Sequence, residues 1–266
     1  MLANPDRAHE FAVQVRFINE QMFSEPINEQ TLVGGVEDCR FPLMSLIKPF
    51  TLLYRLQQLG EEQVLHLIDV QSSEYPFNSL AQLELDQGKP RNPMINSGAI
   101  ALAALLPGQT VSERCDHFCQ WLNQLSGSHL TLDQPMLASV ESLPNPINRA
   151  IAHLLKQAGH IDSIETALDT YQRICCFSGT VDDLAKLGLL LARPHARLKP
   201  THQRMVNAVM LTCGLYEDSP RYAVQIGLPM KSGVSGGLLA IVPGEGAIAC
   251  YSPPLDRAGN SVRGIA

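Results

Sequence analysis

The pattern of apolar and polar residues predicts a strand near the start of the chain and a helix soon after it. Apolar residues alternate with polar ones over residues 11–18, which is typical of a half-buried strand. From residue 46 to residue 59, apolar side chains recur at three- and four-residue spacing, as on one face of a helix. Pro49 is tolerated only in a first turn and Gly60 suits a helix end, so we expect this helix to begin near residue 45.

The middle of the chain is predicted to be helical, and its last part returns to β-structure. Segments with helical spacing lie at 99–106, 111–125, 147–158, 164–175 and 181–191. Three β-rich runs follow between glycine and proline turns, at 221–226, 237–242 and 247–251. This order indicates a sheet built from both chain ends, with a helical part of about residues 98–210 inserted between them. The sequence contains no convincing linker, so we expect one domain over residues 1–266.

Composition narrows the classes of protein to which the chain can belong. Of its 266 residues, 45% are apolar and only 17% are charged, which excludes a disordered chain. The net charge is −6 without a basic block, so we expect no nucleic-acid partner. The longest apolar stretch, residues 98–106, is far shorter than the ~20 residues that a membrane span needs. No secretory signal is recognisable, so we expect a cytoplasmic protein without a membrane segment and with its seven cysteines reduced.

Two short motifs point to a serine nucleophile. Ser45-Leu-Ile-Lys48 places a hydroxyl and an amine one helical turn apart, so the lysine can take the serine proton. Lys231-Ser-Gly233 precedes a predicted strand, and the two motifs occur in the order used by serine β-lactamases and penicillin-binding proteins. In such a fold the triplet lies on an edge strand facing the serine, and the N–H of Val234 completes an oxyanion hole. Each motif also has an alternative without a catalytic role. The first could contain an ordinary solvated lysine, and the second could be a glycine-rich turn between strands.

Other polar residues are candidates for proton transfer or ligand binding. The Ser-Asp-Asn motif of class A lactamases is absent, so Tyr171 or Tyr216 is the candidate replacement, although packing is the commoner role of a tyrosine. Asn96 begins a predicted helix, where it either caps the helix or binds a ligand. Glu141 and Asn148 flank a proline-containing loop, where a carboxylate suits an ammonium ligand; a surface glutamate is the alternative.

Two further features are set aside. Cys115, His117 and Cys119 lie in a predicted helix that otherwise presents packing residues, and no second cysteine and histidine cluster is near, so we expect no metal site. The glycine-rich run at 232–237 lacks the Gly-Lys-Ser/Thr ending of a nucleotide-binding loop.

Taken together, these motifs resemble the glutaminase family, serine-dependent enzymes that hydrolyse L-glutamine to L-glutamate and ammonia. The matching runs are Ser45-Leu-Ile-Lys-Pro49, Phe77-Asn-Ser79, Asn92-Pro-Met-Ile-Asn-Ser-Gly-Ala-Ile100, Glu141 with Asn148, Tyr171 with Cys175, Cys213-Gly-Leu-Tyr216, Gly227-Leu-Pro-Met-Lys-Ser-Gly-Val234, Ser252-Pro-Pro-Leu-Asp256 and Gly259-Asn-Ser-Val262. They cover most of the chain in order. The resemblance implies an α+β fold of the β-lactamase and transpeptidase type, with a mostly antiparallel sheet.

The resemblance also implies roles for individual residues. Ser45 would be the nucleophile, Lys48 its activating partner and Tyr216 the residue that passes the proton. The backbone N–H groups of Ser45 and Val234 would form the oxyanion hole. Glu141 would bind the α-ammonium group of the substrate. The α-carboxylate of the substrate would contact the asparagine and tyrosine side chains, namely Asn96, Asn148, Tyr171 and Tyr216. Family members need no metal or organic cofactor, and they assemble as homodimers or homotetramers.

Departures from the family pattern keep two alternatives open. The family's Tyr-Ile-Pro-Gln stretch, whose tyrosine lines the pocket, has no counterpart in this sequence. The loop after Glu141 carries Pro144 and Pro146 where the family favours small polar residues. One alternative is therefore a pseudoenzyme that binds glutamine or glutamate. The other is a different serine amidase of the same fold, acting on a β-lactam or a peptide.

Overall fold

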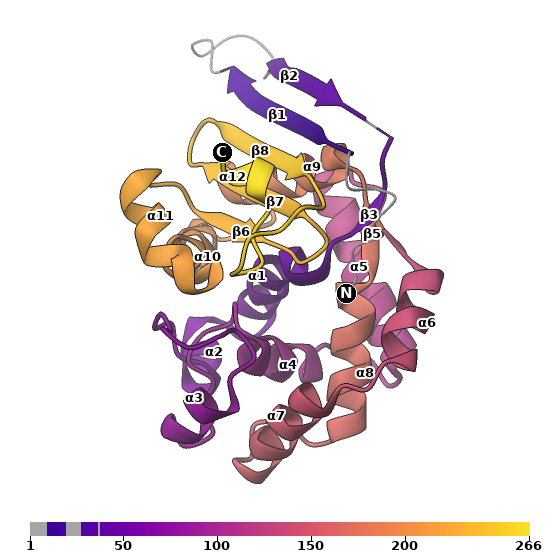
Figure 1. Cartoon of the computed structure of the whole chain (residues 1–266), viewed down its shortest axis with the longest axis vertical. Helices are drawn as coiled ribbons and strands as arrows, with labels where there is room; N and C mark the ends of the chain where they lie inside the picture. The colour runs from indigo at the N-terminus through magenta and orange to yellow at the C-terminus, as the bar shows by residue number, and fades with distance from the viewer. Residues whose placement is uncertain (1–9, 20–27, 37) are drawn as a thin grey trace.

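The computed structural model describes residues 10–19, 28–36 and 38–266, and it confirms the predicted α+β fold class (Figure 1). The larger sheet has the strand order β2-β1-β8-β7-β6, and its neighbouring strands are antiparallel. Its strands are β1 (Ala12–Asn19), β2 (Asn28–Gly35), β6 (Met230–Ser232), β7 (Gly237–Val242) and β8 (Gly246–Tyr251). Because β1 pairs with β8, both chain ends build this sheet, as the sequence predicts.

A second sheet is small and lies beside the helices. It has the order β3-β5-β4, and both of its strand pairs are antiparallel. Its strands are β3 (Phe41–Pro42), β4 (Thr131–Leu132) and β5 (Phe177–Gly179). The Leu43 N–H donates to the Phe177 carbonyl at 2.7 Å, which connects this sheet to the segment that leads into the first long helix.

Helices occupy most of the chain between the two parts of the larger sheet (Figure 1). They are η2 (Met44–Ile47), α1 (Lys48–Leu59), α2 (Glu61–Leu67), α3 (Leu80–Leu85), α4 (Asn96–Ala104), α5 (Val111–Ser126), α6 (Gln134–Ser142), α7 (Pro146–Gln157), α8 (Ile164–Cys175), α9 (Val181–Ala192), α10 (Pro200–Cys213), η3 (Tyr216–Asp218), α11 (Ser219–Gln225) and α12 (Val262–Ile265). The helices predicted in the middle of the chain correspond to α4, α5, α7, α8 and α9. None of the helices in the described ranges is both long and apolar enough to cross a bilayer.

The strand predicted over residues 221–226 is wrong, because this segment belongs to the helix α11. Its β-branched and aromatic residues suggested a strand, but Pro220 lies in the first turn, where proline favours a helix. Gly227, with a φ of 74°, follows the helix as its end signal. Val224 is 88% exposed, so its side chain has no place in the buried face of a sheet. Local helix-end residues therefore outweigh β-propensity here.

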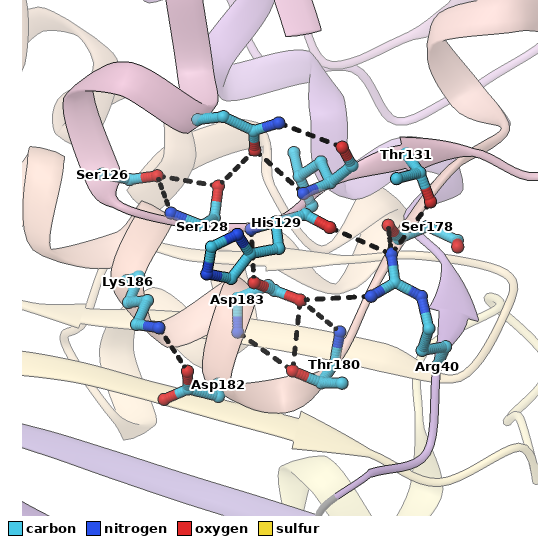
Figure 2. Close-up of polar contacts among 12 residues, drawn as sticks. Arg40, Ser126, Ser128, His129, Thr131, Ser178, Thr180, Asp182, Asp183 and Lys186 are labelled. Carbon is cyan, nitrogen blue, oxygen red and sulfur yellow. Dashed lines mark hydrogen bonds and ion pairs between the residues drawn. The ribbon is translucent and has the colours of Figure 1, made fainter. Parts of the chain in front are cut away.

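A buried carboxylate ties α9 to the segments around it (Figure 2). Asp183 accepts hydrogen bonds from the backbone N–H groups of His129 at 2.7 Å and Thr180 at 3.0 Å. Arg40 lies 3.8 Å from the same carboxylate. Thr180 in turn accepts from the Asp183 N–H at 3.2 Å and caps the helix. These contacts fix the start of α9 relative to the small sheet.

The neighbouring Asp182 ties α9 to β1 of the larger sheet. Its carboxylate pairs with Arg16 of β1 at 2.5 Å and with Lys186 at 2.6 Å, and Gln14 donates to it as well. Burial raises the pKa of Asp182, but the hydrogen bonds from Lys186, Arg16 and Gln14 outweigh this effect and hold the pKa at about 2. The carboxylate is therefore charged near neutral pH.

The helix α9 also lies unusually close to the sheet at Gly188. A Cβ at this position would lie 2.5 Å from the Ala247 Cβ and 2.9 Å from the Leu239 Cδ1. Two carbon atoms that are not bonded cannot lie this close, so a side chain at position 188 would force α9 or the sheet to shift. The absence of a side chain at Gly188 therefore sets the distance between α9 and strands β7 and β8.

We expect Gly188→Ala to lower the melting temperature by about 2–10 °C, because overpacking of a core costs about 1–3 kcal/mol. Differential scanning calorimetry measures this change. The double variant Gly188→Ala/Ala247→Gly is the matched control, since it removes the opposing methyl group, and it should melt above Gly188→Ala. Equal melting of the wild type and Gly188→Ala would contradict the close approach.

Candidate active site

Ser45 lies in a strained turn directly before α1. It belongs to the 3-10 turn η2, and Lys48 is the first residue of α1. Met44 has a φ of 48°, in the left-handed region that residues other than glycine rarely adopt. Backbone strain of this kind is held only where the surrounding structure requires it, and it is common at functional sites. The turn leaves Ser45 only 7% exposed, with its side chain in the wall of a cavity.

The amine of Lys48 is buried among neutral acceptors. Its Nζ donates to Asn96 Oδ1 at 2.9 Å and to the Met94 carbonyl at 3.0 Å, and the residue is 1% exposed. Burial lowers the pKa of Lys48 to about 8, while the nearby Cys175 thiol raises it by a smaller amount. A lysine with this pKa is partly neutral near pH 8. Its amine can therefore accept a proton from a neighbouring hydroxyl.

Asn96 connects several of the predicted site residues. Its Oδ1 accepts hydrogen bonds from Lys48 and, at 3.1 Å, from the Tyr171 hydroxyl. Its Nδ2 donates to Asn148 Oδ1 at 2.9 Å, which leaves the Asn148 amide nitrogen available to a ligand. These residues come from α1, α4, α7 and α8. One amide side chain thus brings together residues that are far apart in the sequence.

The alternative role of Asn96 as a helix cap is wrong. Asn96 is the first residue within α4, and Ile95 occupies the N-cap position. The Asn92 side chain instead accepts from the N–H groups of Met94 at 3.0 Å and Ile95 at 3.2 Å. Because Asn92 satisfies this turn, the Asn96 side chain is free to bond to Lys48.

Tyr216 lies on the other side of Ser45 and is held by the Lys231 motif. The Tyr216 hydroxyl donates to the Ser232 carbonyl at 3.1 Å. Burial raises the pKa of Tyr216, and the Ser45 hydroxyl offsets part of that effect. The phenol therefore stays protonated near neutral pH. Tyr216 has a φ of 57°, a second strained position in the site.

Lys231 lies on the strand that its motif predicts, but the sequence assigns no role to its side chain. It is fully buried on β6, an edge strand as predicted, and its Nζ lies 4.4 Å from the centre of the Tyr216 ring. The amine donates to the Gly214 carbonyl at 2.9 Å and to the Ser232 carbonyl at 2.7 Å. Ser232 thus accepts from both Lys231 and Tyr216. Lys231 therefore holds the turn that carries Tyr216 against the edge of the sheet.

A cavity of about 380 Å³ opens beside Ser45. Among the predicted site residues, Ser45, Asn96, Asn148, Tyr171 and Val234 line it. Tyr171 is 7% exposed, and burial raises its pKa well above the ordinary value, so its hydroxyl keeps its proton. Val234 follows β6 and faces the same cavity as Ser45. The structure thus gathers a serine, its hydrogen-bonded neighbours and several amide and hydroxyl groups around one space.

Lys48, Tyr216 and Glu141 are the predicted site residues that do not line this cavity; Lys48 and Tyr216 are buried, whereas Glu141 is not. Glu141 is exposed near the end of α6, and the lining includes its neighbour Val140 instead. Burial raises the pKa of the cavity-lining Cys176 to about 12, and the charge of Glu141 adds a small part to this rise. The Glu141 carboxylate is therefore close enough to the cavity wall for its charge to act there.

Phe77 and Cys175 are further parts of the site, and the sequence analysis assigns them no role. The Phe77 ring centre lies 5.9 Å from the Lys48 amine and 4.9 Å from the Tyr216 ring. Both Phe77 and Cys175 line the cavity. Their presence in the runs that resemble the family was the only signal for them. Spacing alone does not place an aromatic ring between two polar groups.

Comparison with known proteins identifies close relatives along nearly the whole chain. The family model for glutaminase matches residues 7–266. A glutaminase of Synechocystis sp. is 44% identical over 262 residues, covering 97% of this chain and 80% of the relative. A glutaminase of Brucella canis is 41% identical over 248 residues, covering 89% of this chain and 77% of the relative.

Solved structures agree with these matches. The probable glutaminase ybaS has a TM-score of 0.88 at 37% identity, covering 97% of this chain and 83% of that one. The Bacillus subtilis glutaminase YbgJ, solved as a covalent complex with 5-oxo-L-norleucine formed by reaction with 6-diazo-5-oxo-L-norleucine, has a TM-score of 0.82 at 28% identity, with coverage of 97% and 84%. These likenesses confirm the β-lactamase-like fold. With a family model that matches residues 7–266 and a relative at 44% identity, this chain belongs to the glutaminase family.

Proposed function

We propose that this chain carries out the glutaminase reaction with Ser45 as its nucleophile. The reaction is the hydrolysis of L-glutamine to L-glutamate and ammonia. The observation that carries the assignment of Ser45 is the buried Lys48, one turn further along the chain, whose pKa is about 8. The covalent complex of the related YbgJ with a glutamine analogue supports a nucleophile in sites of this kind. The polar residues around one cavity supply the remaining groups.

The reaction proceeds in two stages through a seryl ester. In the first, Ser45 Oγ attacks the γ-carbonyl carbon while Lys48 takes the serine proton, directly or through Tyr216. The backbone N–H groups of Ser45 and Val234 stabilise the negative charge that forms on the oxygen. The C–N bond then breaks, the leaving nitrogen takes a proton from Tyr216 as ammonia forms, and Lys48 returns the serine proton to Tyr216 and becomes neutral again. In the second stage, water attacks the ester while Lys48 takes its proton, and that proton passes to Ser45 Oγ as glutamate is released.

The remaining polar residues orient the substrate. The Asn148 amide nitrogen and the Tyr171 hydroxyl contact the α-carboxylate, which also lies at the first turn of α7, where free backbone N–H groups favour a negative charge. Asn96 fixes both of these residues and Lys48 at once. Tyr216, held by the Ser232 carbonyl, completes the set of residues that contact the substrate in this proposal. Glu141 attracts the α-ammonium group from the exposed end of α6.

Side chains, backbone N–H groups and water carry every step of this mechanism. The resemblance to the family supports a cytoplasmic enzyme that assembles as a homodimer or homotetramer, and we include both in the proposal. L-Glutamine is the small-molecule partner.

We expect Ser45→Ala to reduce ammonia release from L-glutamine by at least about 10⁴-fold, because no other group forms the ester. In addition, 6-diazo-5-oxo-L-norleucine should add its mass to the Ser45 peptide of the wild type and leave Ser45→Ala unmodified. Coupled ammonia assays and peptide mass mapping make these measurements. Ser112→Ala, at an exposed position on α5, is the control for a lost serine hydroxyl.

The same experiment separates the two alternatives. A folded wild-type protein that binds glutamine without releasing ammonia would be a pseudoenzyme. Covalent labelling by penicillin without glutamine turnover would indicate the other serine amidase.

The pH dependence of the reaction should follow the protonation state of Lys48. A lysine amine accepts a proton only when neutral, so kcat/KM for glutamine should rise with pH and level off above an apparent pKa of about 8. Well below that pKa, kcat/KM should fall about tenfold per pH unit. Initial rates from pH 6 to 9.5 test this. Lys89→Arg, at a lysine far from the cavity, should keep the profile, whereas a flat wild-type profile would refute Lys48 as the base.

Asn148 and Glu141 should differ in their effect on KM. Asn148→Ala should raise KM for glutamine by about tenfold or more, because a hydrogen bond to a charged group contributes about 1.5–3 kcal/mol. Glu141→Gln should raise KM by at most about fivefold, because an exposed ion pair contributes up to about 1 kcal/mol. Steady-state kinetics of both variants provide the test. A larger effect from Glu141→Gln would mean that Glu141 turns into the cavity when substrate binds.

A further inference from the structure

The mouth of the cavity is apolar next to Asn148. Leu143 and Ile147 line it while remaining 51% and 43% exposed to solvent. Pro144 and Pro146 line it between them, and both are exposed. We call these four residues the apolar rim. Large apolar side chains that are half exposed at a pocket mouth lose water when a ligand with an apolar part covers them.

Free glutamine does not use this rim. In the proposed orientation its methylene groups lead from the α-carbon toward Ser45, deep in the cavity, and its α-carbon carries only charged groups. A cavity of about 380 Å³ falls in the range of about 300–1,000 Å³ that holds drug-sized ligands. A free amino acid is smaller than such ligands. The cavity therefore has room for a substituent on the amino acid, and the rim determines its chemistry.

The position of the rim in the chain indicates where that substituent begins. The rim directly precedes Asn148, which contacts the α-carboxylate in the proposed function, and Pro146 and Ile147 share the first turn of α7 with it. The α-nitrogen is bonded to the same carbon as that carboxylate. A chain attached to the α-nitrogen therefore starts beside the rim. The opposite end of the substrate, at Ser45, stays unchanged.

Little in the cavity requires the α-nitrogen to be charged. Glu141 is exposed and lies outside the lining, so its attraction for an ammonium group is weakened by solvent. Loss of that charge on acylation therefore costs little binding. An acyl chain in contact with Leu143 and Ile147 gains apolar burial in exchange.

We propose that the site also deamidates Nα-acyl-L-glutamines, with an alkanoyl chain on the apolar rim. This inference rests on the proposed function, because the chemistry at Ser45 is the same. Ser45 Oγ forms a bond to the γ-carbonyl carbon, the C–N bond breaks, and the serine proton leaves with ammonia. Water then releases Nα-acyl-L-glutamate, and the α-amide bond stays intact. The substrate class is an acidic acyl amino acid with a medium-length apolar chain.

The test measures ammonia release from L-glutamine and from Nα-acetyl-, Nα-butanoyl- and Nα-hexanoyl-L-glutamine. A fully buried methylene favours binding about fourfold. Because the rim stays partly exposed, we expect kcat/KM to rise at least about tenfold from the acetyl to the hexanoyl compound. In Leu143→Ser/Ile147→Ser, the ratio of kcat/KM for the hexanoyl compound to that for glutamine should fall about tenfold or more. Val224→Ser, at an exposed valine on α11, is the matched control and should leave that ratio unchanged.

The outcomes separate this inference from the proposed function. Ammonia from glutamine but not from any acyl compound would overturn the inference and leave the proposed function standing. Turnover of the acyl compounds without a rise along the series, or with the same ratio in the double variant, would also overturn it, because the rim would then contribute nothing. Turnover of the hexanoyl compound alone would support the substrate class and reject free glutamine as the substrate. No ammonia from any compound would overturn both.

Discussion

The mechanism that we propose depends on the removal of one lysine amine from water. Lys48 is held among neutral acceptors, and burial brings its pKa to about 8. An exposed lysine would remain charged and could not accept a proton near neutral pH. Asn96 maintains this arrangement, because its amide bonds to groups from α1, α7 and α8 while it belongs to α4. The packing of these helices thus sets the basicity of the lysine.

A second buried lysine, Lys231, donates hydrogen bonds to backbone carbonyl groups. Lys231 donates to the carbonyls of Gly214 and Ser232, and Tyr216 donates to Ser232 as well. These bonds secure a turn in which Tyr216 keeps a positive φ. Burial lowers the pKa of Lys231 well below its usual value, and the positive charge of Lys48 lowers it further. Of the two amines, Lys48 therefore holds a proton more readily, and in the mechanism that we propose Lys231 acts by positioning the Tyr216 phenol.

The sequence predicts the parts of this structure that depend on local signals. Helical spacing located α8 and α9, and a sheet built from both chain ends followed from the order of elements. The prediction of a strand at 221–226 is wrong because a short apolar run fits either a strand or a helix. Only Pro220 and Gly227 indicate that this run is a helix. The roles of Lys231 and Phe77 could not be predicted, because they arise from contacts between elements far apart in the chain.

The deep part of the site and the mouth of the cavity depend on different interactions. Deep in the site, the side chains of Lys48, Asn96 and Tyr216 are bonded to other elements, so a change there alters several contacts together. At the mouth, Leu143 and Ile147 are half exposed and contribute apolar area alone. A substitution there changes how much of a ligand is buried without moving Lys48 or Tyr216. In the mechanism that we propose, the range of substrates can therefore vary while the proton transfer at Ser45 stays constant.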